Sequence, residues 1–492
     1  MKEGAGAEIP ASSVAAQVYE LAMQRALCVC GDDVYRRRLY EAEAHTAELV
    51  TALARQPVRA YASLDAVLAQ SQKEQGLMLS TRQCEAVRCC LQQPFSILTG
   101  GPGTGKTTVL RVILDVYQKL EGGTVLQAAP TGRAARRMIQ STGLPAGTLH
   151  SVLGLVAKGE GTTYHTKGLA PLAVDFVVVD ETSMMDIFLA EELFRRIRPG
   201  AKLLLVGDAD QLPSVGPGNV FRDLIRSGVL PVTRLDTVFR QSGASRIALN
   251  AQLIRQNRAT LLEGPDFQFL PCADETAASA MIQRLYLDET ARVGIDQVQV
   301  LSPFATRGEV SVQKLNQVLR DKVNPARFGV QERTVDGTVF REGDRVVQTK
   351  NSGEVSNGDT GVIRRIRFDD EEGLEVSIDF GESRTVHYGE KEMAHIQLAY
   401  ALTIHKSQGG EYAVVILPML TGFYKLLSRN LVYTAITRAK KRVILVGQKK
   451  ALYMAIHKDG SDRRNSMLAN RLSMLFSDSS PQPETNKQKE VS

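Results

Sequence analysis

Glycine, lysine and threonine follow one another in a spacing that suits the binding of a polyphosphate. Residues 97–108 have the sequence ILTGGPGTGKTT, in which Gly100, Gly105, Lys106 and Thr107 fit the pattern GxxxxGKT. A short apolar run precedes this stretch and apolar residues at helical spacing follow it, which predicts a strand, a glycine loop and a helix. Such a loop presents backbone N–H groups and the positive end of the helix to phosphate oxygens. We expect Lys106 to reach the β and γ phosphates of a nucleotide and Thr107 to bind Mg²⁺.

Two adjacent carboxylates follow another strongly apolar run. Residues 176–179 are Phe-Val-Val-Val, as expected of a strand buried on both faces, and Asp180 and Glu181 come next. In a protein with such a glycine loop, the first carboxylate holds Mg²⁺ and the second can activate the attacking water. Further along, the amide of Gln211 could sense the γ phosphate, and Arg240 could stabilise the charge that develops during phosphoryl transfer.

A basic segment follows the second apolar strand. The sequence APTGRAARRM places Thr131 and Gly132 in a turn, with Arg133, Arg136 and Arg137 on the helix behind it. This group lies at the carboxyl end of an expected parallel strand, where open α/β sheets bind ligands. We therefore favour contact with phosphodiester groups over the alternative of a solvated charged face.

Two more polar clusters are candidates for the same surface. Thr148 and His150 form one, and His405, Lys406 and Ser407 form the other. Lysine and serine side chains suit a phosphate backbone, whereas a lone histidine is more often structural. Neither cluster identifies its ligand by itself.

Composition places limits on the class of protein. The chain has 492 residues, 43% of them apolar, which allows about three domains at roughly 150 residues each. A formal charge of +6 is compatible with a polyanion partner. The six cysteines form no CxxC pair, and neither a secretory leader nor a long apolar run is evident. We expect a protein of the reducing cytoplasm, with no membrane partner.

The pattern also predicts the order of domains. Apolar residues at 374, 376, 378 and 380 alternate with polar ones, which predicts a small β-barrel interrupting a second α/β unit. Residues 431–433 look strand-like. We expect a helical region at 1–78, a first α/β domain at 79–241 with a short hairpin at about 154–169, a second α/β domain at 242–342 and 398–460, the barrel at 343–397, and a short helix with a polar tail at 461–492.

Eight segments occur in an order known from one group of motor proteins. They are GGPGTGKTT, APTGRAA, TLH, DETSM, GDADQLPSVGPG, VFRQ, TIHKSQGGEY and LVYTAITRAKK. Together they resemble the motif series of superfamily 1 helicases, most closely the RecD-like branch, over residues 79–446. The resemblance implies an α/β fold with two RecA-like parallel-sheet motor domains, an inserted SH3-like β-barrel and an N-terminal helical subdomain, in a short form without the additional N-terminal modules of longer members.

The resemblance also implies roles for individual residues. Catalytic roles fall on Lys106, Asp180, Glu181, Gln211, Arg240 and Arg438. The metal ligands would be Thr107 and Asp180. Nucleotide contacts fall on Gln83, which would read the adenine edge, and on Gly101, Gly103, Thr104, Gly105, Lys106, Thr107, Thr108, Gln211, Arg240, Gly409 and Arg438. DNA contacts fall on Thr131, Gly132, Arg133, Thr148, His150, His405, Lys406 and Ser407.

The expected function is an ATP- and Mg²⁺-dependent DNA helicase that moves 5′ to 3′ in recombination or repair. Its partners would be single-stranded DNA, junctions between single and double strands, and other repair or recombination proteins, and the chain would act as a monomer. One alternative is a DNA-stimulated motor subunit that translocates but needs a partner to unwind, because the expected hairpin is short. A second, a DNA-binding scaffold without activity, is disfavoured because every catalytic residue named above is present.

Overall fold

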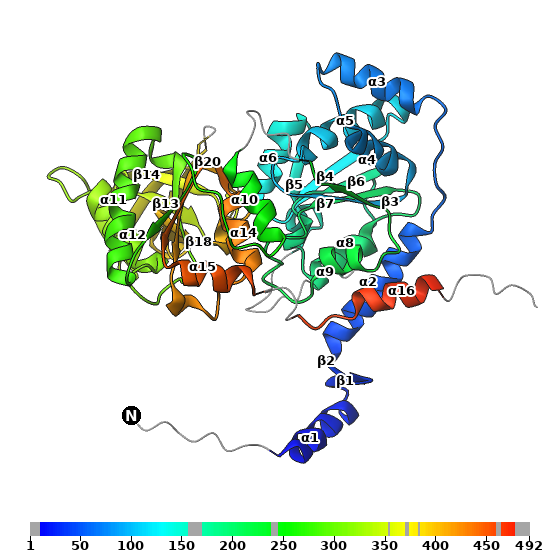
Figure 1. Cartoon of the computed structure of the whole chain (residues 1–492), viewed down its shortest axis with the longest axis horizontal. Helices are drawn as coiled ribbons and strands as arrows, with labels where there is room; N and C mark the ends of the chain where they lie inside the picture. The colour runs from blue at the N-terminus through cyan, green and yellow to red at the C-terminus, as the bar shows by residue number, and fades with distance from the viewer. Residues whose placement is uncertain are drawn as a thin grey trace, which may run out of the picture.

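The computed structural model describes residues 10–155, 170–237, 245–352, 355–369, 373–381, 384–458 and 464–477. Its main parts are an N-terminal region, two parallel sheets with their helices, and a smaller antiparallel sheet (Figure 1). Within these ranges, no helix combines the length and the apolar character needed to cross a bilayer.

The N-terminal region is mainly helical, as expected, but it also contains a β-hairpin that the sequence did not lead us to predict. Its elements are α1 (Ala11–Met23), β1 (Leu27–Cys30), β2 (Asp33–Arg36), α2 (Arg37–Ala54) and α3 (Leu64–Glu74). Gly31, with a φ of +60°, and Asp32 make the two-residue turn between the antiparallel strands. Helix α1 has no buried residue and projects from the body of the protein (Figure 1).

The first parallel sheet has six strands in the order β5-β4-β6-β7-β3-β8. Its elements are α4 (Thr81–Gln92), β3 (Phe95–Gly100), α5 (Lys106–Leu120), β4 (Val125–Ala129), α6 (Gly132–Thr142), β5 (Ala146–Thr148), α7 (Leu149–Val152), β6 (Phe176–Val179), the 3₁₀ turn η1 (Thr182–Met184), α8 (Ile187–Arg196), β7 (Lys202–Gly207), α9 (Val220–Arg226) and β8 (Val232–Leu235). Strands β3, β6 and β7 are buried along their whole length, as expected of apolar runs covered on both faces. Because these neighbours are parallel, the loops that follow them meet at one edge.

The second parallel sheet has five strands in the order β18-β10-β19-β20-β9. Its elements are α10 (Arg246–Arg255), β9 (Phe267–Pro271), α11 (Glu275–Val293), η2 (Ile295–Gln297), β10 (Val298–Ser302), α12 (Val312–Val323), β18 (Ala401–Thr403), η3 (His405–Ser407), β19 (Tyr412–Met419), η4 (Thr421–Phe423), α14 (Arg429–Thr437), β20 (Ala439–Gly447) and α15 (Lys449–Ile456). The interpretation of 431–433 as a strand is wrong, because these residues lie in α14. That helix is buried at every position from 430 to 437, so its apolar run has no helical period to reveal it.

The antiparallel sheet interrupts the second parallel sheet between β10 and β18, which are neighbours in it. A hairpin of β11 (Glu332–Val335) and β12 (Thr338–Arg341) comes first. The sheet itself has the order β16-β15-β14-β13-β17. It contains β13 (Arg345–Gln348), β14 (Thr360–Asp369), β15 (Gly373–Asp379), β16 (Thr385–Tyr388), α13 (Glu390–Met393) and β17 (Ile396–Leu398). The expected alternation is confirmed in β15, where every second residue is buried.

Two contacts join parts that are distant in the sequence. Leu212, from the loop after β7, belongs to the apolar core of the second sheet. Helix α16 (Leu468–Ser477), which follows the second sheet in the chain, packs on α2 and α9 beside the first sheet (Figure 1). Side chains from the first sheet's half of the chain pack in the core of the second, and side chains from the C-terminal segment pack beside the first.

Candidate functional site

The glycine loop joins β3 to α5, and two of its glycines have left-handed backbones. Gly103 and Gly105 have φ angles of +74° and +85°, which residues with a side chain rarely adopt. Lys106 begins α5, and its ammonium donates hydrogen bonds to the carbonyl oxygens of Gly100 (2.6 Å) and Gly101 (3.1 Å). A bound phosphate would offer this ammonium charged acceptors in place of the two carbonyls.

Gln83 supports the loop from α4. Its side-chain oxygen accepts a hydrogen bond from the N–H of Ser80 (3.0 Å), and the Ser80 hydroxyl accepts one from the N–H of Gln83, which completes a capping box. Its Nε2 donates to the carbonyl of Thr104 (3.1 Å). A Cβ at Gly105 would lie only 2.5 Å from that Nε2, so this approach requires glycine. Both ends of the amide are engaged within the protein, and adenine contact by Gln83 stays a prediction.

The loop after β6 places two carboxylates beside the glycine loop. Asp180 accepts a hydrogen bond from the N–H of Glu181 (2.8 Å), and Glu181 has a φ of +50°, an uncommon backbone conformation outside glycine. Burial, followed by the negative charge of Glu181, raises the pKa of Asp180 to about 6. The carboxylate of Asp180 and the hydroxyl of Thr107 are hard oxygen donors of the kind that Mg²⁺ prefers. The residues present therefore fit a magnesium ion.

The loop after β7 is tied to α14 of the other sheet. Nε2 of Gln211 lies 3.4 Å from Oδ2 of Asp208, and Tyr433 donates its hydroxyl proton to the same oxygen (2.9 Å). The N–H of Leu212 donates to the hydroxyl oxygen of Thr434 (2.8 Å). Oε1 of Gln211 is buried and has no hydrogen-bond partner among the described residues, which is costly unless a ligand supplies one.

These loops surround one cavity of about 480 Å³ between the two parallel sheets. Thr104 and Thr108, which were also predicted to contact nucleotide, lie outside its lining. The cavity brings together nine of the predicted site residues, namely Gly101, Gly103, Gly105, Lys106, Thr107, Asp180, Glu181, Gln211 and Arg438.

The wall of the cavity opposite the glycine loop is basic, and of its charged residues the sequence analysis assigned only Arg438 to the nucleotide site. The guanidinium of Arg438 is buried with Nη1 3.9 Å from Glu181, while Arg137 and Lys440 lie 2.6 and 3.0 Å from Glu411. Burial alone would raise the pKa of Glu411, but Arg137 and Lys440 hold it below its ordinary value. For Lys440, the run of basic residues after Arg438 was the only local sign of a place in this wall. Arg137 had been assigned to the DNA surface instead.

Three further predictions remain, for Arg240, for the hairpin and for Gly409. Arg240 and most of the predicted hairpin, 156–169, lie outside the described residues. Gly409 lies against α6 instead of lining the cavity, since a Cβ there would be 3.0 Å from the hydroxyl oxygen of Thr131.

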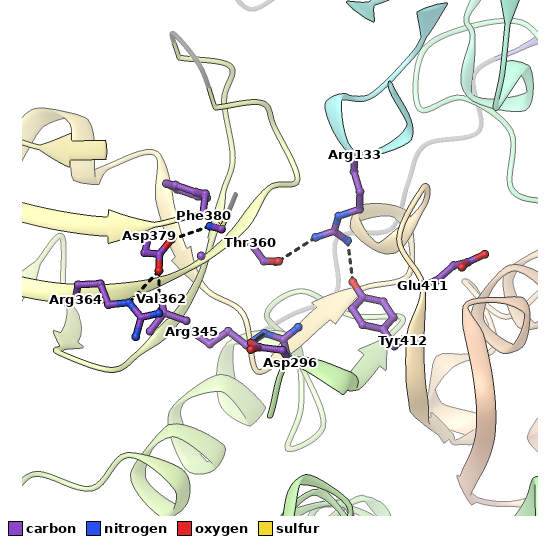
Figure 2. Close-up of a pocket in the computed structure, with 12 residues that line it drawn as sticks. Arg133, Asp296, Arg345, Thr360, Val362, Arg364, Asp379, Phe380, Glu411 and Tyr412 are labelled. Atoms are coloured by element: carbon purple, nitrogen blue, oxygen red, sulfur yellow. Dashed lines mark hydrogen bonds and ion pairs between the residues drawn. The ribbon is translucent and has the colours of Figure 1, made fainter. Parts of the chain in front are cut away.

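Arg133 joins α6 to both the antiparallel sheet and the second parallel sheet. Its guanidinium donates to the hydroxyl of Tyr412 (2.9 Å), the carbonyl of Gly358 (2.7 Å) and the hydroxyl of Thr360 (3.3 Å). Figure 2 shows Arg133 between Thr360 and Tyr412 at the edge of a cavity of about 350 Å³. Arg133 therefore lies where three parts of the molecule meet.

The start of α6 contacts the antiparallel sheet at two further points. Thr131 caps the helix by accepting a hydrogen bond from the N–H at 134 (3.3 Å). Gly132 lies so close to Ser356 that a Cβ would be 2.2 Å from its hydroxyl oxygen. Arg136 forms a two-pronged ion pair with the buried carboxylate of Asp359. The antiparallel sheet is thus held against the turn that we predicted to contact DNA.

A separate cavity of about 390 Å³ lies between the first sheet and the antiparallel sheet. Gly132, Thr148 and His150 line it on one side, and Val355 and Ser356 line it on the other. Thr148 also caps α7 by accepting a hydrogen bond from the N–H of residue 151 (3.1 Å). Burial lowers the pKa of His150, which favours the neutral imidazole.

The predicted residues of η3 lie outside that cavity. Lys406 donates to the side-chain oxygen of Gln397 (2.7 Å), and burial lowers its pKa. Ser407 is fully buried and donates to the carbonyl of Ile404 (2.7 Å). Burial, with a smaller contribution from the charge of Arg464, lowers the pKa of His405. Contact between η3 and DNA stays a prediction.

Comparison with known proteins agrees with this arrangement. Three family models match: an AAA domain at 78–267, the SH3 domain of ATP-dependent RecD-like DNA helicases at 315–380, and a UvrD-like helicase C-terminal domain at 398–446. The ATP-dependent RecD2 DNA helicase of Deinococcus radiodurans is 33% identical over 437 residues, which are 88% of this chain and 58% of that protein. The RecBCD enzyme subunit RecD of Mycobacterium tuberculosis is 32% identical over 419 residues, which are 76% of this chain and 70% of that protein.

Among solved structures, the crystal structure of the Pif1 helicase from Candida albicans aligns with 82% of this chain and 100% of that chain, at 20% identity and a TM-score of 0.47. The site has the parts of a P-loop NTPase with two parallel-sheet domains. A glycine loop and paired acids come from one sheet and an arginine from the other, all around one cavity. The chain belongs to the RecD-like family of ATP-dependent DNA helicases.

Proposed function

We propose that this chain hydrolyses ATP to move 5′ to 3′ along single-stranded DNA and to separate the duplex ahead of it, in recombination or repair. We assign the two motor domains to residues 79–241 and to 242–342 with 398–460. The main support is that the nucleotide cavity has walls from both parallel sheets. A nucleotide there would contact Lys106 from one sheet and Arg438 from the other, so its binding and release favour different separations of the sheets.

The residues around the cavity divide the chemistry of ATP hydrolysis among them. Lys106 exchanges the carbonyls of the glycine loop for phosphate oxygens. Thr107 and Asp180 would hold Mg²⁺, which neutralises phosphate charge. Glu181 orients the attacking water and accepts its proton, and Arg438 stabilises the negative charge that grows on the phosphoryl group.

The strand would bind on the side that carries α6, α7 and η3. Contacts from Thr131, Arg133, Thr148 and Lys406 to the phosphate backbone would be largely independent of base sequence and should weaken with salt. The antiparallel sheet closes over this side through Arg136 and Asp359, so we assign it the role of covering the bound strand.

Steady-state ATP hydrolysis, with and without a short single-stranded DNA, tests the proposal. We expect strong stimulation in the parent and its loss in Glu181→Gln, because an amide cannot accept the proton from water. Glu48→Gln, at an exposed position of α2, is the matched control and should behave like the parent. If the parent hydrolyses ATP at the same rate with and without single-stranded DNA, the proposal that the chain is a DNA-dependent motor is wrong.

Duplexes with a single-stranded tail on one end test direction and strand separation. We expect unwinding with a 5′ tail, and unwinding only with a 3′ tail would refute the proposed direction. Displacement of a protein block from single-stranded DNA, without unwinding of either duplex, would instead identify a translocating subunit that needs a partner.

A further inference from the structure

The C-terminal segment returns from the second sheet to the first. Residues 464–477 follow the whole second sheet in sequence, yet Leu468 and Leu472 are fully buried in the core beside α2 and α9. Arg471 donates a hydrogen bond to the carboxylate of Glu43 on α2 (3.0 Å), with its guanidinium over a neighbouring tyrosine ring. We refer to residues 464–477 as the return arm (Figure 1, in red).

Arg464 connects the return arm to the loop that follows Gln211. Its guanidinium donates to the carbonyl oxygens of Gly216 (2.6 Å) and Gly218 (2.7 Å) and to the carbonyl of Ser214. It also lies 3.3 Å from the Ser214 hydroxyl. The planar guanidinium has five N–H donors, so it can hold several backbone carbonyls in one arrangement.

The loop at 214–218 is also fixed from its other side. The N–H of Ile187 donates to the carbonyl of Pro217 (3.0 Å), and a Cβ at Gly216 would lie 2.1 Å from a carboxylate oxygen of Asp186. The loop begins three residues after Gln211, whose amide lines the nucleotide cavity. Two residues, Leu212 and Pro213, connect Gln211 to this loop.

Residues predicted to contact the strand interact electrostatically with this guanidinium or with the neighbouring Asp186. The charge of Arg464 contributes to the lowered pKa of His405, and the carboxylate of Asp186 interacts with both Arg464 and His150. His405 comes from the second sheet and His150 from the first. Arg464 thus interacts electrostatically with a predicted strand contact while its guanidinium holds the loop that follows Gln211.

We infer that Arg464 is a positioning residue that fixes the 214–218 loop and thereby couples strand binding to ATP hydrolysis. This inference rests on the proposed function. The loop has two glycines and an exposed valine, and three of its carbonyls are held by one side chain from a distant segment. Loss of that side chain removes the restraint on one side of the loop, so that a bound strand no longer sets the position of Gln211.

The position of the loop can be tested independently of activity. The chain contains no tryptophan, and Val215 at the centre of the loop is 83% exposed, so Val215→Trp introduces a single reporter. In that background we expect Arg464→Ala to lower the steady-state fluorescence anisotropy of the indole. Arg471→Ala weakens the same arm at Glu43, away from the loop, and should leave the anisotropy unchanged. Equal anisotropy in Arg464→Ala and its parent would overturn the positioning role.

The second measurement is the ratio of ATPase rates with and without single-stranded DNA. We expect this ratio to fall about tenfold in Arg464→Ala. In Arg464→Lys, which keeps a cation and three donors, the ratio should recover in part. In Arg471→Ala it should equal that of the parent. An equal fall in Arg471→Ala would mean that docking of the arm, and not Arg464, matters. A parent without stimulation would refute the proposed function, whereas an unchanged ratio in Arg464→Ala would refute the coupling alone.

Discussion

The two parallel sheets have the same architecture but contribute differently to the nucleotide cavity. In the first sheet, the loops after β3, β6 and β7 supply the glycine loop, both acids and Gln211. The second sheet supplies Arg438, Lys440 and Glu411 from the ends of α14, β20 and β19. We therefore infer that the first sheet holds the nucleotide phosphates and that the second adds charge from the opposite side of the cavity. The difference lies in the loops and not in the sheets.

The largest effect should come from removing the ammonium of the first sheet. Lys106→Ala is expected to lower ATP turnover by about 10³-fold or more, because the phosphates lose a contact in both the bound and the transition state. Lys119→Ala, on the exposed side of the same helix, is the control and should leave turnover unchanged. Turnover that survives Lys106→Ala would mean that the first sheet does not hold the phosphates.

Removing the arginine of the second sheet should affect catalysis more than binding. Arg438→Ala is expected to lower kcat by about 10²- to 10³-fold with little change in the KM for ATP, because the guanidinium acts on charge that develops during the reaction. Arg292→Ala, at an exposed position of α11, controls for charge. A change in the KM for ATP alone in Arg438→Ala would mean that both sheets contribute to ATP binding, contrary to the comparison above.

A smaller effect is expected where the two sheets are joined. Tyr433→Phe removes the hydroxyl that binds Asp208 and leaves the ring in place. The full 1.5–3 kcal/mol of a hydrogen bond to a charged group corresponds to about 10- to 150-fold in rate, but this bond acts on the reaction only through the position of Gln211, so we expect kcat to fall by about fivefold to tenfold. Tyr453→Phe, at an exposed position of α15, is the control. Unchanged kinetics in Tyr433→Phe would show that Gln211 is positioned without help from the Tyr433 hydroxyl.

The smallest effect on turnover, and a clear one on stability, is expected at Lys202 in β7. Burial lowers the pKa of this lysine to about 8, and its ammonium donates to the carbonyl of Leu91. The unfolded chain, with a normal lysine, binds more protons between about pH 8 and 10.5, so the free energy of unfolding rises with pH in that window.

Lys202→Met should remove this dependence, which amounts to about 2 kcal/mol between pH 7.5 and 10. Denaturant unfolding at the two pH values measures it. Lys322→Met, at an exposed position of α12, should retain the dependence. An equal change in the free energy of unfolding between the two pH values in Lys202→Met and in the parent would show that the buried ammonium is not destabilised by the first sheet.

The parts of the fold that could be predicted from the sequence are those with local signals. Strand β6 and residues 203–206 of β7 are continuous apolar runs, and the glycine loop has a pattern that no other local structure requires. The convergence of the loops followed from parallel pairing, because the carboxyl ends of neighbouring parallel strands share an edge. Hence Lys106, Asp180, Glu181 and Gln211 were expected in one place, and the cavity brings them together.

The remainder depends on contacts that no local pattern records. Arg137 and Glu411 are 274 residues apart and meet only because two sheets face each other. The only sequence signal for the hairpin of β1 and β2 is a Gly-Asp pair between two short strands, and we did not predict the hairpin from it. The run at 431–433 is apolar because α14 is covered on all sides, and complete burial removes the periodicity that separates helix from strand.

The return arm also sets an order for the maturation of the protein on the ribosome. The acceptor surface on α2 and α9 is synthesised early, but Leu468 and Leu472, which cover it, emerge only after the whole second sheet. Until then the first sheet carries an uncovered apolar face, a state that favours association with chaperones or with other nascent chains. Completion of the first half of the molecule therefore waits for the synthesis of the second.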